Sequence, residues 1–168
     1  MLICSICLTT DKMQIQFEYL ADHPECVPLV IDWWRTVWSD RIGSDLARAS
    51  EQLRSSLSRD ELPINILAML HERPVGTAAL KLQEVEDLFP DKQYWLGSVF
   101  VDKTYRGVGI ASALCMKIVQ LAEQKGVPHL YLQTLDLDGG LYGKLGWKPV
   151  QLFNVRDEDT LLMIRKLS

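Results

Sequence analysis

The sequence predicts a single α/β domain in which one mixed β-sheet is covered by helices on both faces. Segments with the apolar spacing of strands and of helices follow one another in the order β-α-α-β-β-β-α-β-α-β-β, which suits a sheet packed between helices. The chain has 168 residues, about the length of one domain. Its 48% hydrophobic and 24% charged residues are proportions typical of a folded globular protein, which argues against global disorder.

The first elements are predicted to be one strand and two helices. From Met13 to Tyr19 apolar and polar residues alternate, as in a half-buried strand. A helix is predicted over residues 24–39, because apolar residues recur there every three or four positions. The same spacing predicts a second helix over residues 44–58. Residues 1–12 do not fit this pattern, so we expect a loosely attached or disordered extension before a domain of residues 13–168.

Strands make up most of the remaining chain. Short apolar runs bounded by turn residues predict strands, and a long apolar stripe that ends at Gly126 predicts a helix. The strand over 94–101 is mostly apolar and is therefore expected at the centre of the sheet. The predicted elements are strands over 64–70, 75–82 and 94–101, a helix over 108–125, a strand over 129–134, a short helix over 141–145, and a terminal hairpin of strands over 147–154 and 160–167.

The net charge and the cysteine content limit which binding partners and which cellular compartment are expected. A net charge of −4 argues against a broad nucleic-acid-binding face. No apolar run approaches the roughly 20 residues that a membrane-spanning helix needs, so no membrane partner is expected. The four cysteines are scattered rather than spaced as a disulfide framework, which favours the reducing cytoplasm. Cys4 and Cys7 have no second pair at zinc spacing, so no metal site is expected.

A glycine loop between a strand and a helix is the clearest functional signal. Glycine at positions 107 and 109 lets a ligand approach the backbone closely, with a tight turn that binds no ligand as the competing interpretation. Free N–H groups and the helix dipole make the start of the following helix an anion site that suits a pyrophosphate. A Walker loop is excluded because Gly-Lys-Ser/Thr is absent. A Rossmann fingerprint fits poorly because Ser112 stands where it needs Gly or Ala.

Two motifs resemble those of one enzyme superfamily. Arg106-Gly107-Val108-Gly109-Ile110-Ala111, after a strand that ends in Val-Phe-Val, resembles motif A of the GNAT superfamily of N-acetyltransferases. Leu141-Tyr142-Gly143-Lys144-Leu145-Gly146-Trp147 resembles the family's Leu-Tyr-x-x-x-Gly-Phe motif, with Trp in place of Phe. The order of elements agrees as well. The resemblance implies a GNAT fold with a splayed sheet, and transfer of an acetyl group from acetyl-CoA to a primary amine by direct attack.

The resemblance also implies where acetyl-CoA, the expected co-substrate, binds. The strands over 94–101 and 129–134 would splay, and the cofactor would enter the gap. Backbone groups at the end of the first strand would face the pantetheine arm and the thioester, and N–H groups of the loop and helix start would hold the pyrophosphate. The residues that the resemblance assigns to cofactor binding are Val99, Phe100, Val101, Arg106, Gly107, Val108, Gly109, Ile110, Ala111 and Ser112.

Tyr142 is the expected general acid for the departing thiolate. A thiol pKa of about 8.5 and a tyrosine pKa of about 10 are close enough for proton donation. The general base is less obvious, since many family members carry a Glu on the central strand or the next one, and this chain has no such residue there. Asp136 is our candidate base or water relay, although it also suits a turn beside two glycines. Asp138, bulk water, and Glu84 or Glu86 through water remain alternatives.

The acceptor is expected to be a small-molecule amine or a peptide N-terminus. Trp33, Trp34 and Trp95 are candidates for packing against it, with core filling as the competing interpretation. A loop with four acidic residues, at 84–91, would attract a cationic amine. Two alternative functions stay open: a domain that senses acyl-CoA without turnover, and a transferase for a bulkier acyl group. A homodimer through the terminal hairpin is a further expectation.

Overall fold

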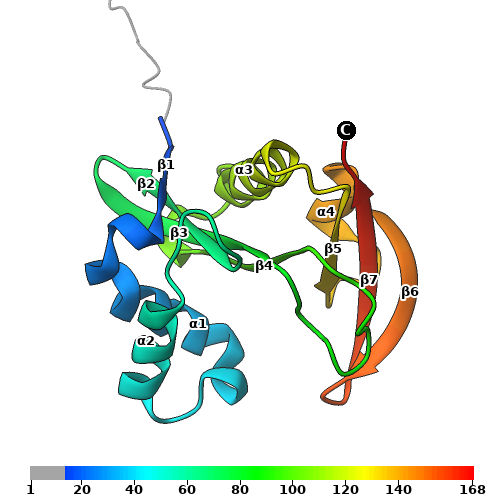
Figure 1. Ribbon diagram of the computed structural model, residues 1–168, viewed down its shortest axis with the longest axis horizontal. Helices are drawn as coiled ribbons and strands as arrows, with labels where there is room; N and C mark the ends of the chain where they lie inside the picture. The colour runs from blue at the N-terminus through cyan, green and yellow to red at the C-terminus, as the bar shows by residue number, and fades with distance from the viewer. Residues whose placement is uncertain (1–13) are drawn as a thin grey trace, which may run out of the picture.

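The computed structural model of the protein describes residues 14–168 (Figure 1). The expected extension over residues 1–12, with Cys4 and Cys7, lies outside the described residues. The strands are β1 (Gln16–Tyr19), β2 (Ile64–Leu70), β3 (Arg73–Lys81), β4 (Trp95–Val101), β5 (His129–Thr134), β6 (Lys148–Val155) and β7 (Glu158–Lys166). The α-helices are α1 (Val27–Ile42), α2 (Leu46–Ser55), α3 (Ile110–Gln124) and α4 (Gly140–Lys144), with short 3-10 turns at Leu20–Asp22, Pro24–Cys26 and Lys103–Tyr105.

All seven strands of the described chain form one mixed sheet in the order β1-β2-β3-β4-β5-β7-β6. Neighbouring strands are antiparallel except β4 and β5, which run parallel. That parallel ladder contains a single residue pair, Trp95 and Tyr131, strengthened by a 2.8 Å hydrogen bond from the Tyr131 N–H to the Tyr94 carbonyl. Beyond this pair the strands part. The prediction of a mixed, splayed sheet is therefore confirmed.

Helices cover both faces of the sheet, as predicted. In Figure 1, α3 lies over one face, and α1 and α2 lie over the other. Strand β2 shows how the sequence divides between these layers: Ile66 and Ala68 face the α3 side, whereas Leu67 and Met69 pack with α1. Alternation of this kind, with both sets apolar, is what a strand buried on two faces requires.

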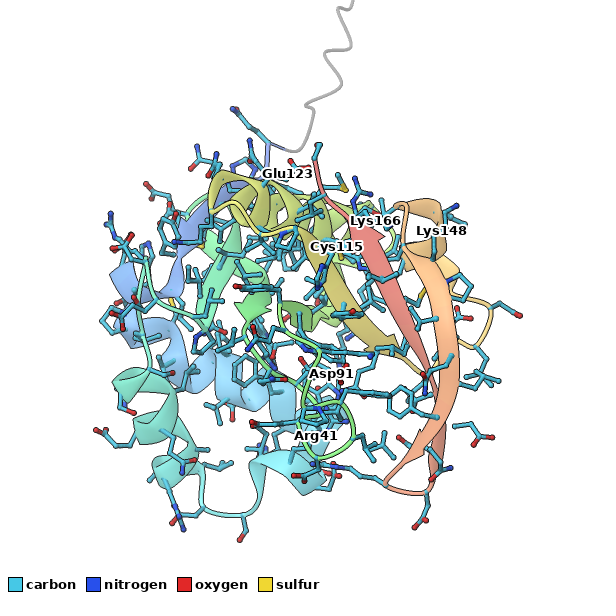
Figure 2. The ribbon with its side chains drawn as sticks, turned by 45° about the vertical axis from the view of Figure 1, so that its right-hand side comes forward. Arg41, Asp91, Cys115, Glu123, Lys148 and Lys166 are labelled. Carbon is cyan, nitrogen blue, oxygen red and sulfur yellow. The ribbon has the colours of Figure 1, made fainter. Side chains whose placement is uncertain are left out.

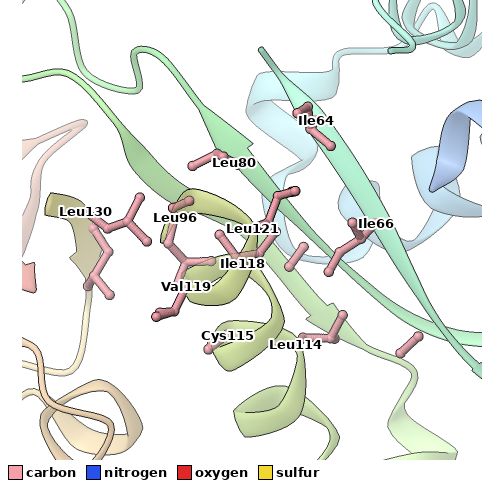
Figure 3. Packing of buried hydrophobic residues seen from close by; sticks show 14 of the residues in the cluster. Ile64, Ile66, Leu80, Leu96, Leu114, Cys115, Ile118, Val119, Leu121 and Leu130 are labelled. Atoms are coloured by element: carbon pink, nitrogen blue, oxygen red, sulfur yellow. The ribbon is translucent and has the colours of Figure 1, made fainter. Parts of the chain in front are cut away.

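The larger core lies beneath α3. Its apolar stripe, including Leu114, Ile118 and Leu121, packs against side chains of β2, β3 and β4 (Figure 3). The same core includes Leu130 of β5 and Trp147, the residue before β6, so α3 packs against both halves of the sheet where their ladder ends. Among residues 14–168, no helix is long and apolar enough to cross a membrane.

Element boundaries shift from the predicted ones for local reasons. The turn of the first hairpin takes only His71 and Glu72, both with positive φ, so β3 begins two residues earlier than predicted. Helix α2 ends at Ser55, three residues early, where the side chains of Ser55 and Ser56 bond back to carbonyls of the last turn. Helix α1 continues past the predicted end but is kinked at Trp38, whose φ of −125° and ψ of 46° are not helical.

Candidate active site

Two pockets follow one another along β4, on the side where β5 has separated from it. The first, which we call the α1 pocket, measures about 360 Å³ and contacts β4 from Leu96 to Val99. The second, the α3 pocket, measures about 410 Å³ and contacts β4 from Val99 to Val101. Both contact Val37, Val99 and Tyr142, so the pockets meet at these side chains.

The α3 pocket is lined by the glycine loop and the first turn of α3. Every residue expected to bind the cofactor lines it except Val108, whose side chain is 53% exposed. Helix α3 begins at Gly109, which adopts a left-handed conformation with a φ of 90°. The first helical N–H donor is that of Ala113, so the N–H groups of Ile110, Ala111 and Ser112 precede the helical hydrogen bonds.

Glycine is required at the two turns of this loop. Gly107 and Gly109 have φ values of 81° and 90°, a region that other residues rarely adopt. The space in which a Cβ would stand is empty at both positions, with nothing within 4 Å. The loop therefore offers open backbone at the positive end of a helix dipole, which is the setting that favours a bound anion.

Arg106 fixes the loop to the end of the central strand. Its Nε donates a 2.8 Å hydrogen bond to the carbonyl of Val101. Its guanidinium carbon lies 5.3 Å from the ring centroid of Phe100, in a cation–π arrangement. The Arg106 side chain thus holds the loop in place through contacts within the protein.

A bulge interrupts β4 between the two pockets. Phe100 pairs with Thr77 and Gly97 pairs with Ala79, so Ser98 and Val99 together oppose the single residue Ala78. Ser98 has a φ of 54°, which is unusual for a residue other than glycine. Bulges leave backbone groups outside the ladder, and this one lies where the pockets meet.

Tyr142 stands at the junction of the pockets on the short helix α4. Its ring makes an edge-on contact with Trp147, with 6.2 Å between ring centroids. The Trp147 N–H donates to the Tyr142 carbonyl at 3.1 Å, which closes the turn after α4. Burial raises the pKa of the Tyr142 hydroxyl well above its ordinary value, and nearby Cys115 and Glu84 raise it further. The hydroxyl is consequently a protonated donor at neutral pH.

The α1 pocket carries charged side chains of both signs. Asp40 and Arg41 come from the end of α1, which Figure 2 marks with the label of Arg41, and Arg156 and Glu158 come from the β6–β7 hairpin. Arg156 Nη1 lies 2.7 Å from Asp40 Oδ2, and this hydrogen bond holds the pKa of Asp40 below its usual value. The pair joins α1 to the hairpin across the pocket.

Glu84, in the loop after β3, is the most enclosed carboxylate of this pocket. Its side chain is 10% exposed and lies 3.4 Å from the ammonium of Lys81, measured from Oε2 to Nζ. Gln133 Nε2 donates to its other oxygen, Oε1, at 3.4 Å. One signal in the sequence pointed to this residue, namely an acidic loop that leads into the central strand.

The structure corrects the expectation for the tryptophans. Trp33 is 6% exposed and stacks on Phe100, and Trp95 is fully buried with its Nε1 donating to the Lys92 carbonyl. Trp34 lines a separate hollow between α1 and α2. The tryptophan that lines the α1 pocket is Trp38, which lies at the kink in α1.

Asp136 also lies elsewhere than a general base would need. Its Oδ1 accepts a 3.1 Å hydrogen bond from the Asp138 N–H, and its other oxygen packs against Gly140. Neither aspartate lines the α1 pocket or the α3 pocket. Asp136 therefore forms the turn before α4, which was its competing interpretation. Within residues 14–168, no cluster of three or more His, Cys, Asp or Glu side chains is placed to hold a metal ion.

Several solved structures with a similar fold bear the names of acetyltransferases. The chain is similar to an aminoglycoside 6'-acetyltransferase type Ii at 22% identity and a TM-score of 0.69, over 92% of this chain and 97% of that one. It is similar to an aminoglycoside 6'-N-acetyltransferase in complex with coenzyme A at 18% identity and a TM-score of 0.69, over 92% and 97%. It is also similar to the PaiA N-acetyltransferase of Thermoplasma acidophilum in complex with coenzyme A, at 18% identity and a TM-score of 0.65, over 92% and 99%.

At sequence identities of 18% to 22%, the similarity between this chain and these structures shows a shared fold. Among curated proteins no significant match is found. The sequence itself matches the family model described as acetyltransferase (GNAT) family over residues 23–147. This span contains both motifs and the β4 residues that line the two pockets. The chain belongs to the acetyltransferase (GNAT) family.

Proposed function

We propose that this acetyltransferase moves an acetyl group from acetyl-CoA to a primary amine by direct attack within a ternary complex. The observation that carries the proposal is the meeting of two pockets at Val99 and Tyr142. One pocket has the free N–H groups of a helix start, which suit a pyrophosphate. The other has charged walls that suit a polar acceptor. Two reactants entering from the two pockets would meet beside Tyr142 without a covalent enzyme intermediate.

The α3 pocket is the proposed site of acetyl-CoA. N–H groups from Gly107 to Ser112 would hold the pyrophosphate, helped by the dipole of α3. The pantetheine arm would lie in the gap that opens after the Trp95–Tyr131 pair, where β4 has no partner strand on that side. An extended chain can add to such an edge as another strand does, through backbone groups of Val99 and Val101. The coenzyme A complexes of two similar structures support this use of the fold.

The bulge and Tyr142 supply the proposed chemistry. The amine nitrogen attacks the thioester carbon, and a backbone N–H near Phe100 or Val101 stabilises the oxyanion, an effect worth about 3 kcal/mol. The carbon–sulfur bond then breaks, and the sulfur takes a proton from the Tyr142 hydroxyl. Because burial raises the pKa of Tyr142, its proton is in place at the pH of the reaction. The raised pKa also makes Tyr142 a weaker acid than the free side chain, so its hydrogen bond to the departing sulfur carries much of the effect.

The acceptor is proposed to be a small-molecule amine or a peptide N-terminus in the α1 pocket. Two similar structures bear the names of aminoglycoside acetyltransferases, which supports a cationic amine. Cytoplasmic location and a homodimer through the β6–β7 hairpin stay predictions.

Calorimetric titration tests the first half of this proposal. We expect acetyl-CoA and CoA to bind with micromolar dissociation constants, since both carry the pyrophosphate. Thiol release from acetyl-CoA, followed over a panel of primary amines, tests the second half. Absence of acetyl-CoA binding by the folded protein would contradict the assignment of the α3 pocket. Binding without thiol release for any amine would instead favour the sensing alternative.

A further inference from the structure

We propose that Glu84 is the carboxylate that binds the acceptor amine and takes its proton. The proposal rests on the proposed function and deepens it, because it assigns the proton acceptor to a loop residue outside the central strand. It also sets the substrate class as a cationic primary amine, which needs an anionic partner before it can attack.

Glu84 reaches the reacting region because the central strand leaves space for it. Gly97 in β4 has no side chain, and the carboxylate of Glu84 occupies the place where one would project: a Cβ added at Gly97 would overlap Glu84 Oε2. Gly97 does not have a positive φ, so the strand geometry does not itself demand glycine. The missing side chain is explained by the carboxylate that fills its position.

The surroundings of Glu84 leave one of its two carboxylate oxygens without a hydrogen bond. Oε1 accepts from Gln133. Oε2 faces the Lys81 ammonium at 3.4 Å, yet it is buried and makes no hydrogen bond within residues 14–168. A buried carboxylate oxygen without a hydrogen bond costs free energy. An ammonium group of the acceptor would supply both the missing donor and a positive charge, so binding of a cationic amine would be favoured at this point.

The position of Glu84 relative to Tyr142 fits an acid and a base on one reaction path. Both line the α1 pocket, and the Glu84 charge is near enough to contribute to the raised pKa of Tyr142. The other charged groups that face this pocket are Lys81 from β3, Asp40 and Arg41 from α1, and Arg156 and Glu158 from the hairpin.

The proton balance of the step is complete. The bound ammonium gives one proton to the Glu84 carboxylate, which passes it to solvent. The neutral amine attacks the thioester carbon, a carbon–nitrogen bond forms, and the nitrogen loses a second proton as the amide forms. The carbon–sulfur bond breaks, and the sulfur receives the Tyr142 proton. Tyr142 then takes up the second proton that the nitrogen loses. The net products are amide, CoA thiol and one released proton.

The test is the pH dependence of Glu84→Gln, assayed with spermidine, kanamycin A and a peptide with a free N-terminus. The amine that the wild type acetylates fastest serves as the probe. At pH 7 we expect kcat/KM to fall about 100-fold, the usual contribution of a general base. The loss should shrink about tenfold per pH unit and disappear near pH 9, because neutral amine, with a pKa of about 10, becomes available without a base. A structural role would give a loss that does not change with pH. Glu51→Gln, an exposed glutamate on α2, is the matched control.

Gly97→Ala gives a second, independent test. The added methyl displaces the end of a flexible side chain, so the fold is retained while the carboxylate moves. We expect kcat/KM to fall at least tenfold in the wild type and to change less than twofold in the Glu84→Gln background. Equal losses in both backgrounds would contradict the proposal, since the methyl would then act through the strand.

Besides equal losses for Gly97→Ala in both backgrounds, three outcomes overturn the assignment. Glu84→Gln within twofold of the wild type, or with a loss that is the same at every pH, removes Glu84 as the proton acceptor while the proposed function stands. A wild type that binds acetyl-CoA and acetylates none of the three amines removes the proposed function, and this assignment with it. The first two results are seen only in the variant and the third in the wild type, so the two failures are distinguishable.

Discussion

The hydroxyl of Tyr142 lies at the junction of the pockets, and burial keeps it protonated, so it can donate a hydrogen bond there. The Tyr142→Phe variant removes the hydroxyl and keeps the ring that packs on Trp147. We expect kcat to fall tenfold or more, with little change in acetyl-CoA affinity, because the lost interaction forms only as the thiolate departs. Steady-state kinetics and calorimetry with the same protein measure both quantities. An unchanged kcat would exclude Tyr142 from the chemistry.

Individual side chains were predictable only where a motif fixed them. The motifs led to Tyr142 and to the glycine loop, both of which line the pockets. Tryptophan positions were not predictable, because the ring that lines the pocket belongs to Trp38, at a kink that the apolar spacing does not mark. The roles of Asp136 and Glu84 were not predictable for a similar reason. Their roles depend on the path of a loop, and neither apolar spacing nor turn chemistry determines where a loop carries a carboxylate.

At the level of elements, the start of α3 is the feature most sensitive to substitution. Asp at position 109 would add a carboxylate and a strained left-handed conformation at the proposed pyrophosphate site. We expect Gly109→Asp to lower acetyl-CoA affinity at least 100-fold, measured by calorimetry. Gly126→Asp is the control, since Gly126 has a φ of 72° with open space around it and follows the other end of α3. Equal losses of affinity in the two variants would attribute the effect to strain and not to the site.

The elements themselves followed closely from the sequence. Strands such as β2 and β5 have the bounds that their apolar runs predict, because the runs end at turn residues. The bulge in β4 did not follow, since nothing in Gly97-Ser98-Val99 marks which residue leaves the ladder. The splay between β4 and β5 was predicted through the family motifs. Composition and spacing alone would equally suit a continuous sheet.

For the molecule as a whole, alkaline pH should weaken the fold through one buried thiol. Cys115 lies on the side of α3 that faces the sheet (Figure 2) and is fully buried, and burial raises the pKa of its thiol to about 12. In the unfolded chain the thiol ionises near pH 9, while in the folded chain it keeps its proton. Stability that is intact below pH 9 is therefore lost as the pH rises toward 12, at about 1.4 kcal/mol per pH unit.

Urea denaturation of Cys115→Ala measures this effect. Between pH 8 and pH 10.5 the wild type should lose about 2 kcal/mol more of its unfolding free energy than the variant loses. The loss of unfolding free energy caused by the smaller alanine side chain does not depend on pH, so it cancels in this comparison. Parallel pH dependences in the two proteins would show that the Cys115 thiol does not carry the effect.

Because β4 and β5 share a single residue pair, we expect that this chain can be divided between them. A cut in the loop around Gly126 would break no strand ladder, because residues 14–126 hold β1 to β4 and residues 127–168 hold β5 to β7. The two fragments would still share the apolar surface under α3, to which Leu130 and Trp147 contribute from the smaller one. The proposed path of acetyl-CoA follows the gap between β4 and β5, at the boundary between the two fragments. Reassembly of the fragments would then depend on coenzyme concentration, which is the behaviour of a split-protein reporter for acetyl-CoA.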